Sequence, residues 1–106
     1  MSKYLVQANY VGEGAKGLLK DGGSKRHEVV ENLAKSLGGN VDSFYYALGD
    51  IDLYLIVDFP DHAAATAFAL TVTATGTVTC KTTVLLTPEE IDEVAKKKPS
   101  YSPPGK

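Results

Sequence analysis

The sequence contains a single cysteine, Cys80, so no disulfide can form within the chain. It also lacks any run of 18 apolar residues, which excludes a membrane-spanning helix. The opening residues, MSKYLVQANY, contain neither an apolar signal core nor a cleavage site, so we expect a cytoplasmic protein. The net charge of -2 argues against nucleic acid as the main partner, because phosphate binding needs clustered lysines and arginines.

What is present is an ordinary globular composition: 106 residues, of which 43% are hydrophobic and 23% charged. This length suits one domain and allows an apolar core without disulfides or metal. The end of the chain differs, because it is rich in Lys, Pro and Ser. We therefore predict one domain over residues 1–95 and a disordered, basic, Pro-rich tail over residues 96–106.

Hydrophobic periodicity and turn residues divide the domain into alternating strands and helices. Four segments have the period-two alternation or the β-rich composition of strands: residues 4–10, 41–48, 51–59 and 77–86. Three segments have helical patterns: residues 15–20, a main helix from its N-cap Ser24 to the stop at Gly38-Gly39, and residues 63–73 capped by Asp61. A short last helix follows the capping box of Thr87 and Glu90.

This β-α-β-β-α-β order, followed by a short helix, is the ferredoxin-like order. We therefore predict an α+β fold in which a four-stranded antiparallel sheet carries the helices on one face. The two central segments place apolar or aromatic residues on both faces of the sheet, as Phe44 beside Tyr45 and Tyr54 beside Leu55 illustrate. Because an uncovered apolar face usually marks an interface, we predict a homodimer or higher homo-oligomer that packs sheet to sheet.

Several segments, taken in order, resemble the GYD-domain family. They are Asn9–Lys16, Arg26, Leu37–Gly39, Phe44–Asp52, Val57–Asp61, Gly76–Thr79 and Leu85–Glu90. The family consists of small bacterial and archaeal proteins, mostly of unknown function, and the resemblance implies a dimeric α+β barrel. One departure is Ile51, which stands where the family's Gly-x-Tyr-Asp motif has its tyrosine, although Gly49 and Asp52 match. No role of that phenol is therefore transferred.

Six residues are candidates for contact with a ligand: Tyr10, Lys16, Arg26, Tyr46, Asp52 and Tyr54. Lys16 and Arg26 lie near expected helix starts, where the helix dipole favours a bound anion. An arginine is unfavourable there unless an acidic side chain or ligand pairs with it. The tyrosines and Asp52 lie on strands that would line a space between two subunits, where an aspartate can act as a general base. Alternatively, the tyrosines only pack the interface and Asp52 caps a turn.

The remaining motifs are weaker evidence for a functional site. Gly12–Gly17 formally match G-x-G-x-x-G, but the chain is too small for the parallel sheet of a dinucleotide site, so we predict no cofactor. His27, His62 and Cys80 lack the spacing of metal ligands, so we predict no metal. We interpret Cys80 as a structural thiol, His62 as a surface residue, and His27 as either a surface residue or a general base.

These observations favour a homo-oligomeric module that binds a small anionic or aromatic ligand, or that has a regulatory role. The alternative is a small cofactor-free enzyme, monooxygenase- or isomerase-like, with its site between sheet and helices or at the dimer interface. In that case Asp52, Tyr54 or His27 would transfer protons. A third hypothesis is a structural subunit that assembles through its sheet.

Overall fold

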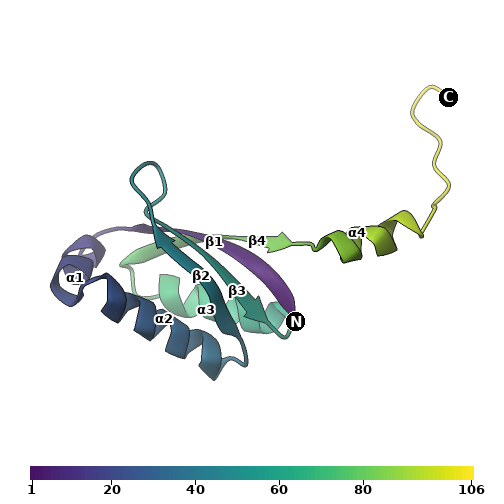
Figure 1. The fold of residues 1–106 in the computed structure, drawn as a ribbon. Coiled ribbons are helices and arrows are strands. Elements are labelled where there is room, and N and C mark those ends of the chain that lie inside the picture. The colour runs from purple at the N-terminus through teal and green to yellow at the C-terminus, as the bar shows by residue number, and fades with distance from the viewer.

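A computed structural model describes residues 1–106 as one antiparallel sheet with helices on one of its faces and a last helix that projects beyond it (Figure 1). The strands are β1 (Ser2–Tyr10), β2 (Asn40–Tyr46), β3 (Leu53–Phe59) and β4 (Val78–Leu85). The helices are α1 (Gly14–Asp21), α2 (Gly23–Ser36), α3 (His62–Thr73) and α4 (Pro88–Ala95). The strand order β2-β3-β1-β4, antiparallel throughout, confirms the predicted ferredoxin-like arrangement. None of the helices combines the length and the apolarity needed to cross a bilayer.

The predicted N-cap of the main helix, Ser24, is wrong. Helix α2 begins at Gly23, with Gly22 rather than Ser24 as its N-cap and without a side-chain cap. Gly22 has φ 85°, a left-handed conformation that glycine adopts without steric cost, and its N–H donates to the Leu18 carbonyl at the end of α1. One glycine therefore ends α1 and begins α2, and Ser24 already lies inside the helix.

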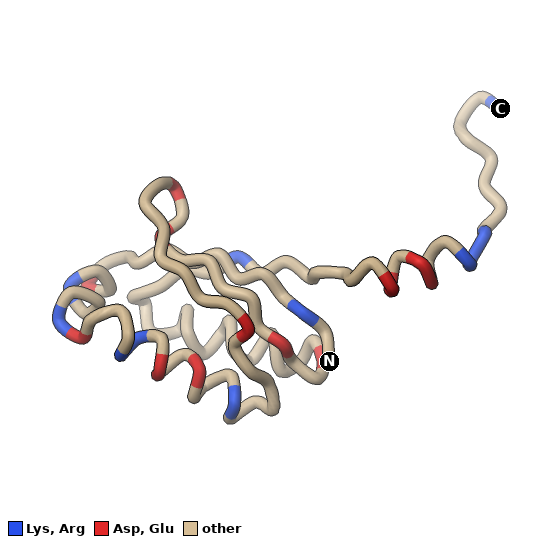
Figure 2. Tube along the Cα trace, in the orientation of Figure 1, with Lys and Arg blue, Asp and Glu red and all other residues tan.

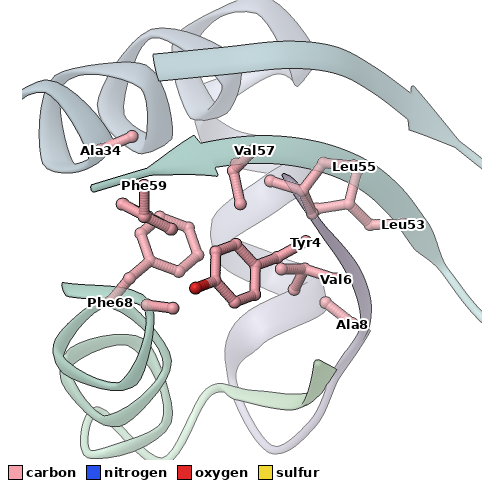
Figure 3. Close-up of a cluster of buried hydrophobic side chains, with 10 residues drawn as sticks. Tyr4, Val6, Ala8, Ala34, Leu53, Leu55, Val57, Phe59 and Phe68 are labelled. Carbon is pink, nitrogen blue, oxygen red and sulfur yellow. The ribbon is translucent and has the colours of Figure 1, made fainter. Parts of the chain in front are cut away.

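The core lies between the helices and one face of the sheet (Figure 3). The period-two alternation of β1 is confirmed, because Tyr4, Val6 and Ala8 all point to this face and are nearly fully buried. Ten residues make up the buried cluster: Tyr4, Val6, Ala8, Ala34, Leu53, Leu55, Val57, Phe59, Ala65 and Phe68. Strands β1 and β3 supply most of it because they are the two central strands of the sheet.

The first residue of α1 is packed so closely that only glycine fits. A Cβ atom at Gly14 would overlap with the Thr77 carbonyl oxygen, whereas a Cβ at Gly17, one turn later, has no atom within 4 Å. We expect Gly14→Ala to lower the free energy of unfolding by about 1–3 kcal/mol because the backbone must move. We expect Gly17→Ala to raise it by about 0.5–1 kcal/mol, since alanine is the better helix former. Urea denaturation followed by circular dichroism measures both, and equal effects would contradict the close contact.

The other face of the sheet, called the open face below, is not covered by any helix of the chain (Figure 1). Alternation along the paired strands places Leu5, Tyr45, Tyr54 and Ile56 on this face. Tyr45 is 72% exposed and Tyr54 39% exposed. The predicted presence of aromatic side chains on both faces is therefore confirmed, while the dimer stays a prediction.

Helix α4 and the tail project away from the end of β4 (Figure 1). Every residue from 88 to 106 is exposed, and the capping box of Thr87 and Glu90 is confirmed. The radius of gyration is 17.2 Å, well above the roughly 13 Å of a compact chain of this length. Residues 96–106 contain neither a helix nor a strand, and their disorder stays a prediction.

Candidate functional site

A cavity of about 470 Å³ lies between α1, α2 and the C-terminal end of α3. It exists because α2 packs mainly on β2 and α3 mainly on β4, so the two helices leave the centre of the sheet partly uncovered between them. A smaller recess of about 60 Å³ lies next to it, toward the sheet. The cavity and the recess share six lining residues: Tyr10, Arg26, Val29, Leu33, Val72 and Val78.

The recess is almost entirely apolar. Twelve of its thirteen lining residues are hydrophobic, and the exception is Arg26. Leu53 and Leu55 line it from the sheet, and Phe68 lines it from α3. Cys80 also lines it and is half-buried, and burial raises the pKa of its thiol, which therefore stays neutral at physiological pH. Cys80 thus behaves as part of an apolar wall, as the sequence indicated.

Two of the six candidate residues, Tyr10 and Arg26, line the cavity, and a third, Tyr46, lies next to them. Tyr10 ends β1, Tyr46 ends β2, and Arg26 lies in the first turn of α2. The Tyr46 hydroxyl donates a hydrogen bond to the Gly23 carbonyl oxygen at 3.0 Å. A Cβ atom on Gly23 would lie only 2.9 Å from the Tyr46 ring, so the start of α2 rests directly on that ring. Tyr46 consequently holds the turn of helix that carries Arg26.

The environment of these phenols keeps them protonated. Burial raises the pKa of Tyr10 to about 12; the neighbouring Tyr46 also raises it, and the Arg26 guanidinium opposes the change. Burial likewise raises the pKa of Tyr46, although Tyr10 and Arg26 act in the opposite direction. At neutral pH both hydroxyls therefore keep their protons. Tyr46 donates its hydrogen bond to Gly23, so Tyr10 is the donor beside the guanidinium that suits an anion.

Arg26 is only weakly neutralised by its own chain. Its Nη1 atom lies 3.9 Å from Asp21 Oδ2, and no other ion pair involves this side chain, which is 31% exposed. Charge-assisted hydrogen bonds between nitrogen and oxygen are typically about 2.7–2.9 Å long. The Arg26 guanidinium therefore keeps most of its capacity to bind an anion.

The other three candidates lie elsewhere. Lys16 is highly exposed and pairs with Glu13 at 3.4 Å. Asp52 Oδ2 accepts a hydrogen bond from the Tyr10 backbone N–H at 2.9 Å, so Asp52 holds the end of β1 as a turn cap. Tyr54 lies on the open face, on the side of the sheet opposite the cavity. The structure thus brings together Tyr10, Arg26 and Tyr46, with Asp52 behind Tyr10.

The model of one protein family, the GYD domain, matches residues 4–95. The chain belongs to the GYD domain family. The match confirms the resemblance in the sequence and includes every residue that lines the cavity. It ends at Ala95, the last residue of α4. No curated protein matches this GYD domain chain.

Several contacts of this GYD domain were not predicted. The Tyr4 hydroxyl, drawn in red in Figure 3, is hydrogen-bonded to His62 Nδ1 at 2.7 Å. His62 is exposed, as predicted, and yet satisfies the polar atom of a buried tyrosine. His27 stacks on Phe44 with ring centroids 4.5 Å apart. These pairs join residues far apart in the sequence, so no local pattern indicates them.

The open face also contains a charged cluster that sequence reasoning missed. Lys3 Nζ lies 3.0 Å from Asp58 Oδ1 and 3.4 Å from Asp42 Oδ2, and these contacts raise the pKa of Lys3, with the hydrogen bond to Asp58 as the main cause. Lys3 and Asp58 are direct partners in the β1–β3 register. Opposite charges at paired strand positions would have indicated the contact once the register was known.

The raised pKa of Tyr10 predicts how the stability of this GYD domain depends on alkaline pH. Between pH 10 and about 12, the unfolded chain loses the Tyr10 proton while the folded chain keeps it, so stability falls as pH rises. We expect Tyr10→Phe to flatten this part of the curve. Tyr101→Phe serves as control because its side chain is 76% exposed, and it should leave the curve unchanged. Urea denaturation across this pH range measures both, and identical curves for the two variants would contradict the burial of Tyr10.

Proposed function

We propose that this GYD domain binds a small organic anion with an apolar body in the cavity between its helices and sheet. The observation that carries the proposal is the position of Arg26. It is the one charged residue that lines both the 470 Å³ cavity and the apolar recess next to it. The carboxylates of Glu13 and Asp21 also line the cavity, but not the recess, so a ligand that spans both meets the Arg26 cation where they join and hydrocarbon in the recess.

The dimensions and the chemistry of the cavity support a ligand of this class. Sites for small molecules typically enclose about 300–1,000 Å³, are mostly apolar and contain a few convergent polar groups. A carboxylate can accept two hydrogen bonds from a guanidinium, and the Tyr10 hydroxyl offers a third donor nearby. An aromatic ring or short alkyl chain would then contact Leu33 and Val72, which belong to the two facing helices.

Binding is favoured over catalysis by the positions of the groups that could transfer protons. Asp52 is engaged by the Tyr10 backbone, and His27 stacks on Phe44 and lies 3.5 Å from Glu31. Neither residue lines the cavity, and Tyr54 does not line it either. The phenols that are present are weak acids held in their neutral form.

The same proposal includes a homo-oligomer formed through the open face. Leu5, Ile56, Tyr45 and Tyr54 give this face an apolar and aromatic surface that no element of the chain covers. The cavity lies on the opposite side of the sheet, so pairing of open faces leaves its entrance free. A two-fold symmetric dimer, in which the same face of two copies pairs, is the commonest way to cover such a surface.

The proposal is tested by titrating the ¹⁵N-labelled full-length chain with sodium phenylacetate and, separately, with neutral phenylacetamide. We expect phenylacetate to shift the backbone amide signals around Tyr10, Arg26 and Val72. We expect the amide to bind at least tenfold more weakly, because it cannot form a charge-assisted pair. Equal affinity for the two probes, or shifts confined to the open face, would contradict the proposed site.

A further inference from the structure

Helix α4 has strong start signals but buries none of its residues. The Thr87 hydroxyl accepts a hydrogen bond from the Glu90 N–H at 3.1 Å, and the Glu90 carboxylate accepts one from the Thr87 N–H at 3.0 Å. Leu86, Ile91 and Val94 are nevertheless 57%, 49% and 56% exposed. The C-terminal arm, residues 86–95, is therefore built as a helix with an apolar stripe that has no partner in its own chain.

An isolated helix of eight residues is not stable in water. Helices shorter than about 12–15 residues are marginal even in alanine-rich sequences, because nucleation costs more than a few hydrogen bonds return. In folded proteins, packing of an apolar face supplies most of the stability of a helix. The eight residues of α4 thus need a surface to pack on.

The open face alone is small for a stable dimer interface. Four strands spaced about 4.8 Å apart, with about seven residues at 3.4 Å each, present a surface of roughly 450 Å². A stable interface buries about 800 Å² on each partner. Burying Leu86, Ile91 and Val94 would add roughly 60–120 Å² for each side chain. Sheet pairing alone is therefore small for a stable dimer, and an additional contact from the arm would bring it close to the usual size.

We infer that the C-terminal arm packs on a second copy of this chain, beside the open face of that copy. This inference rests on the pairing of open faces in the proposed function and adds the arm to that interface. In a two-fold dimer each arm crosses to its partner, so both unpartnered surfaces of the chain, the arm and the open face, are covered by one contact.

Charge complementarity supports a second copy of the chain as the partner of the arm. Helix α4 carries four acidic residues, seen in Figure 2 as the red segments beyond the sheet: Glu89, Glu90, Asp92 and Glu93. Helical spacing places Glu90 beside the stripe of Ile91 and Val94, while Glu89 lies on the opposite face of the helix. On the open face, Lys81 of β4 is exposed and takes part in no ion pair of its own chain. A second copy therefore offers both the apolar surface and a free cation.

The short connection between β4 and α4 favours an arm that crosses to a second copy rather than one that folds back onto its own sheet. Only Leu86 and Thr87 separate Leu85, the last residue of β4, from Pro88. Thr87 is extended, with φ -77° and ψ 160°, and both its N–H and its hydroxyl are engaged in the capping box. The arm consequently continues away from its own sheet, as Figure 1 shows.

The test compares two double variants of the full-length chain by sedimentation equilibrium. Ile91→Gln with Val94→Gln removes the apolar stripe, whereas Glu89→Gln with Glu93→Gln alters the opposite face of the same helix. Glutamine is a good helix former, and α4 buries nothing in its own domain, so both variants should fold normally. We expect the first variant to raise the dimer dissociation constant at least tenfold and the second to change it less than threefold.

Hydrogen exchange of the α4 amides provides an independent readout. We expect these amides to be protected at concentrations that favour the dimer and to exchange freely on dilution. If Tyr54→Lys dissociates the dimer but the Ile91 and Val94 variant does not, the arm inference is overturned while sheet pairing stands. A wild-type chain that is monomeric at every concentration overturns both. Protection of α4 that persists in the monomer overturns the crossing of the arm.

Discussion

Arg26→Gln is expected to weaken phenylacetate binding by about 10- to 100-fold. A hydrogen bond to a charged group contributes about 1.5–3 kcal/mol, and about 1.4 kcal/mol corresponds to a factor of ten. The loss falls on binding rather than on folding, because the only ion pair of Arg26 in the chain is the 3.9 Å contact with Asp21. Isothermal titration calorimetry measures the affinity, and circular dichroism verifies that the thermal unfolding curve is preserved.

The neighbouring residue offers a matched control for this substitution. Lys25 is exposed and does not line the cavity, so Lys25→Gln removes the same unit of charge without removing a contact. We expect it to change the affinity less than threefold. Arg26→Lys should bind at an intermediate level, because it keeps the charge but loses the planar fork of donors. If the Lys25 and Arg26 variants lose affinity equally, only the overall charge matters and the cavity is not the site.

Phe68→Ala is expected to lower the free energy of unfolding by about 3–5 kcal/mol. The Phe68 side chain is 2% exposed, and its ring lies 5.4 Å from that of Phe59, centroid to centroid. It also lines the apolar recess, so its loss removes part of the contact that holds α3 on the sheet. Since domains of this size are stable by only about 5–15 kcal/mol, a large share of the total disappears.

A residue on the same helix controls for helix propensity. Leu70 is 64% exposed, two positions beyond Phe68 on the outer side of α3. We expect Leu70→Ala to change the free energy of unfolding by less than about 1 kcal/mol, as surface substitutions usually do. Urea denaturation of both variants decides the matter. A cost for Leu70→Ala as large as that for Phe68→Ala would mean that α3 does not pack on the sheet through Phe68.

Local signals predicted most of the fold because they act over a few residues. The alternation of Tyr4, Val6 and Ala8 assigned the buried face of β1, and the capping box of Thr87 fixed the start of α4. The prediction failed at Ser24, where two adjacent glycines left the position of the helix break open. Gly22 rather than Ser24 takes the boundary because its positive φ turns the chain sharply.

The site was predicted only in part, because its geometry depends on register and on helix spacing. Tyr45 and Tyr46 are adjacent and must face opposite sides, but which one faces the helices follows from the pairing of Tyr46 with Leu53 and the irregularity between Val41 and Ser43. The gap between α2 and α3 results from the strands on which they pack. No sequence pattern encodes that gap, so the lining residues of α3 were missed.

The most direct test of the cavity is the location of a bound probe by nuclear Overhauser effects. In a sample saturated with phenylacetate, the ring protons of the probe should show contacts to methyl groups of Leu33 and Val72, which line the cavity from α2 and α3. Contacts to methyl groups of Leu5 and Ile56 instead would place the probe on the open face and contradict the account.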